Sequence, residues 1–196
     1  MLALFVAMPA LGAQWDSGPF PPVRGNPADR LDDLPIDDFE YDFARQCTRR
    51  PRPGTRALET WLGAHARGVS WGIMRCSKLG RGHYSLHAEG RAIDWHLDVH
   101  NPLDRAAAEH LIGLMLAPDR LGNPAALARR MGVQELIWNC RTWFAGSPAL
   151  VKYRTCYNRH GKRRKRVDDT SAHRDHVHIG LTRRGAKRRT TFWEAR

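Results

Sequence analysis

The stretch SLHAEGRAID at residues 85–94 places a histidine and an aspartate, His87 and Asp94, on either side of a glycine. A second stretch, HRDHVH at residues 173–178, holds three histidines and an aspartate and ends on His178. A catalytic zinc ion is bound by three protein ligands and keeps a fourth position for water, whereas a structural zinc ion is closed by four side chains. His87, Asp94 and His178 supply such a set of three, and the chain has no CxxC motif. The two stretches therefore predict a metal centre of the catalytic type.

Alternating side chains predict that both stretches contribute strands. In the second stretch, apolar residues alternate with His176 and His178, which is the period of a half-buried strand with both histidines on one face. The same alternation over residues 91–97 makes Asp94 project from a strand on the face opposite its apolar residues. The histidine of the first stretch then lies before this strand, in a turn that Gly90 can close.

The pattern SxHxxGxAxD followed by a late HxH resembles the zinc peptidase superfamily of D-alanyl-D-alanine carboxypeptidases, penicillin-insensitive murein endopeptidases and the related hedgehog signalling domain. The five fixed positions of the first motif are Ser85, His87, Gly90, Ala92 and Asp94. The resemblance covers roughly residues 71–181. It implies that His87, Asp94 and His178 bind Zn²⁺.

The residues beside the last ligand are candidates for acid and base chemistry. His173 and His176 stand where the murein endopeptidases keep two further active-site histidines, and Asp175 stands where the carboxypeptidase branch has a glutamate. A further histidine that the murein endopeptidases carry is replaced here by Tyr84. We expect His176 to take the proton of the attacking water, and His173 to stabilise the oxyanion or protonate the leaving amine. Asp175 is the alternative base, although strand alternation turns it to the other face.

Two residues are candidates for substrate binding. Ser85 is the first fixed position of the motif. Arg75, in the segment GIMR at residues 72–75, resembles the arginine of a GYR segment that holds substrate in the carboxypeptidase branch. One residue is inserted here relative to that pattern, so a surface arginine beside a disulfide is the alternative.

The N-terminal part of the chain differs in composition from the rest. Residues 1–13 are apolar and too short for a membrane span of ~20 residues, so we interpret them as a truncated signal peptide. Residues 14–46 are acidic and rich in proline, which is typical of a linker or wrapping arm. Residues 47–196 remain as the zinc peptidase-like domain with a basic C-terminal part.

Four cysteines and no thiol-based motif predict two disulfides and an exported protein. Three pairings are possible. We favour Cys140 with Cys156, because strand-like residues 135–139 and 151–157 flank a glycine and proline turn. Cys47 would then pair with Cys76.

The chain carries a net charge of +12, and the basic residues are concentrated after residue 152, above all in Lys162–Arg166. Such a field attracts polyanions. For an exported protein these are peptidoglycan and anionic wall polymers, whereas nucleic acid is not expected. A solvated basic face with no dedicated partner is the alternative.

Helical patterns complete the prediction. Residues 55–66 carry an apolar face, Asn101 caps a helix that extends to Leu116, and Asn123 with Pro124 opens a helix over residues 125–131 that Gly132 ends. The fold class is therefore α+β, with a small, mainly antiparallel sheet that carries the zinc site and is flanked by helices.

We therefore expect an exported zinc metallopeptidase that hydrolyses peptide bonds in peptidoglycan stem peptides or crosslinks with a zinc-activated water. The alternative is a non-catalytic, zinc-containing module that binds the cell wall or a polyanion. Nucleic-acid binding would explain the charge but neither motif. The sequence leaves open carboxypeptidase against endopeptidase activity, the bond that is cut and the oligomeric state.

Overall fold

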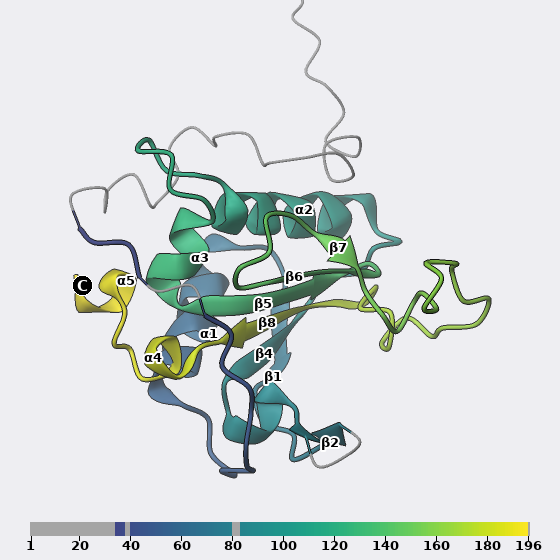
Figure 1. Cartoon of the computed structure of the whole chain (residues 1–196), viewed down its shortest axis with the longest axis horizontal. Helices are drawn as coiled ribbons and strands as arrows, with labels where there is room; N and C mark the ends of the chain where they lie inside the picture. The colour runs from purple at the N-terminus through teal and green to yellow at the C-terminus, as the bar shows by residue number, and fades with distance from the viewer. Residues whose placement is uncertain (1–33, 38–39, 80–82, 196) are drawn as a thin grey trace, which may run out of the picture.

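The computed structural model describes residues 34–37, 40–79 and 83–195 (Figure 1). The expected signal peptide at residues 1–13 and the first part of the acidic arm lie outside the described residues. Within the described residues, no helix is long and apolar enough to cross a membrane.

A six-stranded antiparallel sheet organises the domain, with the strand order β1-β4-β8-β5-β6-β7. Its strands are β1 (Val69–Gly72), β4 (Ala92–His96), β5 (Val133–Trp138), β6 (Arg141–Phe144), β7 (Val151–Lys152) and β8 (His176–Leu181). A separate two-stranded hairpin consists of β2 (Lys78–Leu79) and β3 (His83–Tyr84). The two strands predicted from alternation, β4 and β8, are paired neighbours in the interior of the large sheet. The α+β class and the antiparallel sheet are therefore confirmed.

Helices cover one face of this sheet. They are α1 (Pro53–His65), α2 (Pro102–Leu116), α3 (Ala126–Met131), α4 (Arg183–Ala186) and α5 (Thr191–Glu194), and a short 3-10 helix, η3, spans Leu86–Glu89. The Asn101 side chain caps α2 as predicted, since it accepts hydrogen bonds from the amides of Leu103 and Asp104. Asn123 does not cap α3, because its amide group donates to Asp119 instead.

The core lies between the helices and the apolar face of the sheet. Leu58, Trp61 and Leu62 of α1 are buried against Ile93 and Ile179 in one cluster. Ile93 and Ile179 alternate along their strands with Asp94 and the histidines. Packing of the two isoleucines into the core therefore places Asp94 and the histidines on the opposite face of the sheet.

One strand was missed and one predicted hairpin is wrong. We expected residues 135–139 and 151–157 to flank a single turn, but β6 lies between them and pairs with both β5 and β7. The chain reverses at Asn139 and Cys140, which adopt φ values of 44° and 62° between the paired residues Trp138 and Arg141. Two consecutive positive φ values are the geometry of a two-residue hairpin turn, and no glycine marks it in this sequence.

Both favoured disulfides are confirmed. Cys47 is bonded to Cys76 and Cys140 to Cys156, with Cα atoms 5.6 and 5.5 Å apart. Two disulfides fit an extracellular protein.

The described end of the acidic segment, residues 34–37 and 40–46, lies against the domain. The Asp42 carboxylate pairs with Arg183 at 3.0 Å, and its backbone carbonyl accepts from the buried Arg91 at 2.9 Å. The Asp37 carboxylate accepts the backbone N–H of Thr191. These contacts hold the segment against α4, α5 and the residue that precedes β4.

Candidate metal centre

Three side-chain atoms converge on one point of the polar sheet face. His87 Nε2 lies 3.0 Å from Asp94 Oδ1 and 3.1 Å from His178 Nδ1, and the last two atoms are 3.1 Å apart. All three side chains are buried. The structure therefore brings together the three residues that the sequence proposed as ligands, although they are separated by up to 91 positions.

Strand register accounts for two of the three residues. Asp94 on β4 lies directly opposite His178 on β8, and His96 lies opposite His176. Side chains of opposed residues share a face and have Cβ atoms about 4.5–5.5 Å apart, which is close enough for both to contact one ion.

The third residue comes from η3, which lies on β8. Gly90 ends this helix at φ 67°, in the left-handed region, so the chain turns directly into β4. Gly180 of β8 leaves the room for this packing, because a Cβ atom there would come within 2.4 Å of Leu86. The neighbour of Leu86, His87, is thereby placed over the sheet face.

Outer contacts fix which nitrogen of each imidazole faces the centre. His87 Nδ1 donates to the backbone oxygen of Ile73 at 2.8 Å. His178 Nε2 donates to Glu135, whose Oε2 lies 3.4 Å away. The opposite nitrogens are therefore the ones that face Asp94 Oδ1, and this pattern of outer acceptors is typical of metal-ligating histidines.

The donor set fits a zinc ion. Bonds of ~2.0–2.1 Å in tetrahedral geometry would place the ligand atoms about 3.3–3.4 Å apart, a little wider than the triangle seen here. Two nitrogens and one carboxylate oxygen leave one position of a tetrahedron for water. Other divalent ions accept the same ligand types, so the donor set alone does not identify the ion.

Without a metal, protons hold the cluster together. Burial lowers the pKa of His178, but hydrogen bonds to Asp94 and Glu135 outweigh it and raise that pKa to about 9. Burial raises the pKa of Asp94, but hydrogen bonds from His178 and His87 hold it well below its usual range. Burial also lowers the pKa of His87. The metal-free centre is thus an aspartate beside a protonated His178 and a neutral His87, and a metal ion would displace the proton of His178.

His176 and Asp175 form a pair beside the centre. His176 Nε2 lies 3.5 Å from Asp94 Oδ1, and its Nδ1 lies 2.7 Å from Asp175 Oδ1. The other oxygen of Asp175 accepts from the Thr170 hydroxyl. Asp175 thus faces away from the three ligand atoms and orients His176, whose free nitrogen faces them.

His173 lies behind His176, with ring centroids 4.6 Å apart, and its ring is 5.8 Å from that of His178. Its backbone adopts φ 52°, an uncommon conformation for a residue other than glycine. Burial lowers the pKa of His173 to about 2, with the charges of His178 and His176 adding to the effect. The imidazole is therefore neutral at physiological pH and can act as an N–H donor rather than as a cation.

The two substrate-binding candidates lie in different settings. Arg75 Nη2 is 3.6 Å from Asp94 Oδ2, and its side chain is 60% exposed, so it lies at the rim of the centre. Ser85 is hydrogen-bonded to Ser77 rather than to a residue of the centre. Its hydroxyl pairs with the Ser77 hydroxyl at 3.0 Å, and its amide donates to the Ser77 carbonyl. The structure thus brings Arg75 to the centre and gives Ser85 a part in the turn before η3.

Sequence reasoning missed three residues around the centre. Glu135 holds His178, and the half-buried Tyr41 is hydrogen-bonded to Glu135 in turn. Trp71, 52% exposed, stacks on His96 with centroids 4.1 Å apart and lies 6.0 Å from the His176 ring. The only local signal for Glu135 is that it is the single charged residue of its strand, and Tyr41 and Trp71 carry no signal of this kind.

The fold and the geometry of the site define an α+β domain with a buried His-Asp-His cluster on an antiparallel sheet. The chain belongs to the VldE C-terminal domain family, whose sequence model matches residues 47–177. The matched range includes His87, Asp94 and His176 and ends one residue before His178. No curated protein and no solved structure shows a significant match to the chain.

Proposed function

We propose that this protein is a zinc-dependent peptidase that acts on the peptides of peptidoglycan outside the cell. The observation that carries the proposal is the joint presence of three convergent ligand atoms and a His176 nitrogen 3.5 Å from one of them. Binding zinc requires only the first of these features, whereas an oriented histidine beside the ligands is what hydrolysis requires. The resemblance of the two motifs to the zinc peptidases supplies the substrate class.

The surrounding residues divide the chemistry between them. A zinc ion held by His87, Asp94 and His178 would supply Lewis acidity and activate water near neutral pH. His176 accepts a proton through Nε2, since Asp175 holds its Nδ1–H. His173 offers an N–H to the developing oxyanion.

The rim offers groups that a stem peptide needs. The exposed guanidinium of Arg75 can pair with a substrate carboxylate, because Asp94 Oδ2, 3.6 Å away, is its one ion-pair partner among the described residues. The exposed ring of Trp71 gives an apolar surface beside His176. Both groups suit a short peptide with a free carboxylate.

Metal content and product analysis test the proposal. Protein purified without added metal is expected to contain about one equivalent of zinc, and His87→Ala or Asp94→Ala should reduce it strongly. Zinc-loaded protein should release cleaved peptides from purified peptidoglycan, as measured by mass spectrometry. Free D-alanine would indicate a carboxypeptidase, and loss of crosslinked dimers an endopeptidase.

Two outcomes would contradict the proposal. Full zinc retention in both ligand variants would exclude the centre described above. One bound zinc with no released peptide, in protein whose His176 and Asp175 are intact, would instead favour a non-catalytic binding module.

A further inference from the structure

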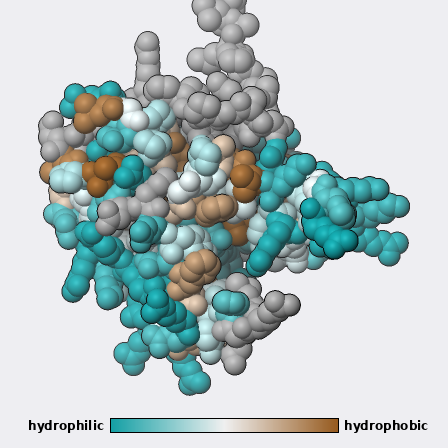
Figure 2. Space-filling model, in the orientation of Figure 1, coloured by the Kyte–Doolittle hydropathy of each residue, from teal (hydrophilic) through white to brown (hydrophobic). Residues whose placement is uncertain are grey.

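The chain between β7 and β8 extends from the body of the domain, as a green to yellow-green loop in Figure 1. Figure 2 shows the same projection as a hydrophilic lobe on the right of the molecule. Residues 152–166 contain eight lysines and arginines and no acidic residue. We call this segment the basic loop. None of its residues is a proposed metal ligand.

The cations of the basic loop have no carboxylate partners among the described residues. Its Lys and Arg side chains are exposed, and the ion pairs nearby involve Arg174 with Asp169 instead. Lys152 donates to the Gly161 carbonyl at 3.3 Å, which leaves its charge uncompensated. The positive charge is therefore available to an external anion.

A disulfide, a β-bridge and side-chain hydrogen bonds constrain the backbone of the basic loop. The disulfide between Cys140 and Cys156 fixes its start, and Tyr157 forms a β-bridge with Arg163. Within this bridge, the Asn158 side chain accepts from the backbone amides of His160 and Lys162 at 3.0 Å. The cations are thus presented from a defined backbone, which reduces the entropy cost of binding.

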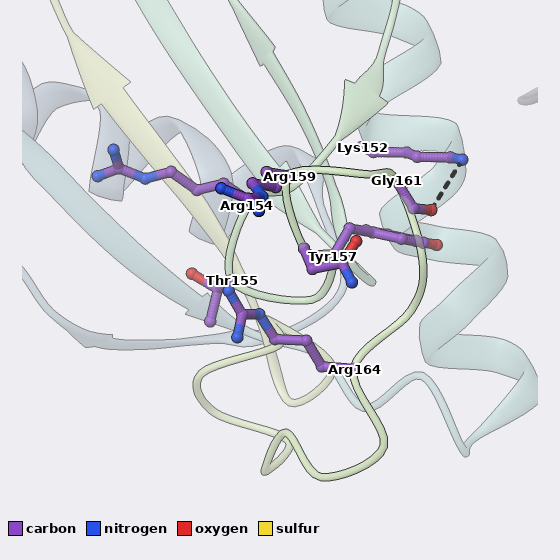
Figure 3. Close-up of a pocket in the computed structure, with 8 residues that line it drawn as sticks. Lys152, Arg154, Thr155, Tyr157, Arg159, Gly161 and Arg164 are labelled. Carbon is purple, nitrogen blue, oxygen red and sulfur yellow. Dashed lines mark hydrogen bonds between the residues drawn. The ribbon is translucent and has the colours of Figure 1, made fainter.

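A pocket of about 650 Å³ lies in the basic loop. Four of its lining residues are cations, and the others offer hydroxyl, amide, or backbone groups; the eight are Lys152, Arg154, Thr155, Tyr157, Asn158, Arg159, Gly161 and Arg164. Figure 3 shows these side chains around the loop, with Lys152 bound to Gly161. Guanidinium groups bind phosphate and carboxylate oxygens through paired N–H donors, so several arginines around one pocket select for oxyanions.

The aromatic residues of the basic loop distinguish between classes of polyanion. Proteins that bind single-stranded nucleic acid without sequence preference combine a basic groove with free aromatic rings on which bases stack. Here the Tyr157 ring lies under Lys152, 5.3 Å from Nζ, and the Tyr153 ring packs edge-on against His173 at 5.2 Å. Both tyrosines are half-buried and also pack against the cluster of Cys140, Cys156 and Ala172, so neither ring stands free as a stacking platform. The loop therefore fits a polymer that is recognised by its charge alone.

We propose that the basic loop is a binding site for a flexible polyanion without bases, whose oxyanions repeat along the chain. Its contact with His173 through Tyr153 places this site next to the metal centre. Binding at the loop requires neither metal nor catalysis. Loss of polymer binding would therefore leave the proposed peptidase activity unaffected, and loss of that activity would leave polymer binding unaffected.

The test compares two variants of the full chain that each remove three positive charges. Arg154→Gln/Arg159→Gln/Arg164→Gln alters the pocket, and Arg56→Gln/Arg105→Gln/Lys187→Gln alters exposed positions on the helical side. Binding of poly(glycerol phosphate), of polyglutamate and of single-stranded DNA of equal charge is measured by fluorescence anisotropy across a salt series, with and without a chelator.

The pocket variant should bind poly(glycerol phosphate) or polyglutamate at least ~10-fold more weakly, whereas the control variant stays close to the native protein. The slope of log affinity against log salt should become shallower by about 2 in the pocket variant, as expected for three lost contacts. The stronger of the two polymers identifies phosphate or carboxylate as the source of the oxyanions. Equal losses in both variants would show non-specific attraction and overturn the site, and tighter, loop-dependent binding of DNA would overturn the class of partner.

Discussion

His176 and Asp175 are adjacent in sequence, yet they face opposite sides of the start of β8 and still contact each other. The side chain of Asp175 turns back to His176 Nδ1, and Thr170 holds its other oxygen. A carboxylate in this position sets the tautomer of the imidazole and leaves Nε2 free to accept a proton. At the residue scale, the role of each histidine depends on which ring nitrogen is hydrogen-bonded and which is left free.

The first prediction distinguishes the general base from the residue that positions it. His176→Ala should lower turnover of a peptidoglycan peptide by at least ~100-fold with zinc content unchanged, the usual scale for a general base. Asp175→Asn should lower it less, since an amide oxygen can still accept the Nδ1–H. Turnover and zinc content are measured on the same samples. A larger loss in Asp175→Asn than in His176→Ala would assign the base to Asp175.

The second prediction concerns Glu135. Glu135→Gln removes the negative acceptor of His178 Nε2–H and should weaken zinc affinity roughly 10–100-fold, as outer-contact variants typically do. Competition with a chromophoric chelator measures the affinity. Glu194→Gln, at an exposed position near the C-terminus, is the matched control and should leave it unchanged. An unaltered affinity in Glu135→Gln would show that this contact does not hold the ligand.

At the scale of elements, β6 and the basic loop depend on one another. The β5–β6 turn places Cys140 at the end of these two strands, and Tyr153 N–H donates to its carbonyl at 2.9 Å. Cys156, Cys140 and Ala172 form a small buried cluster under the loop. The disulfide therefore joins a sheet turn to a loop with little apolar burial of its own.

The third prediction follows from this. Cys140→Ser/Cys156→Ser should lower the free energy of unfolding by about 3 kcal/mol in the chain-entropy model for a separation of 16 residues. Cys47→Ser/Cys76→Ser, with a separation of 29, should lower it by about 3.6 kcal/mol. Denaturant unfolding followed by tryptophan fluorescence measures both. Losses well under ~1 kcal/mol in the two variants would contradict a stabilising role for the disulfides.

For the whole molecule, the metal centre links stability to pH. In the metal-free protein the pKa of His178 is raised to about 9, whereas those of His87 and His173 are lowered. A histidine with a lowered pKa costs stability when pH falls below ~6.5, because the unfolded chain then binds its proton. A histidine with a raised pKa contributes stability that is complete below ~6.5 and is lost as pH rises through about 9.

The fourth prediction is therefore a stability maximum for the metal-free protein near pH 6.5–7. Its free energy of unfolding, measured in chelator, should fall between pH 7 and 9.5. His178→Asn should lack this fall, and so should zinc-loaded protein, whose His178 carries no proton on the ligand nitrogen. Stability of the chelated native protein that rises over this range would contradict the charge state described for the centre.

Much of the fold could be predicted because it follows from local patterns. Alternation identified β4 and β8 and the face on which Asp94 and His178 lie, since the two faces of a strand are a property of the backbone itself. Capping by Asn101 was likewise readable from the residues. The favoured cysteine pairing is confirmed as well, although the single turn from which it was inferred is wrong. The β5–β6 turn was not, because Asn139 and Cys140 adopt their positive φ values without a glycine to signal them.

The sequence by itself determined which side chains could bind a metal, because ligand type and spacing belong to the residues. Only the tertiary structure decided how those side chains are held. The Ile73 carbonyl and Glu135 reach the two histidines through strand pairing between distant segments, and Tyr41 reaches Glu135 from the acidic segment. Asp94 and His178 meet because β4 and β8 pair in one register, and a shift by a single residue would turn one of them to the opposite face. Register is a long-range property of the folded sheet, and no local pattern encodes it.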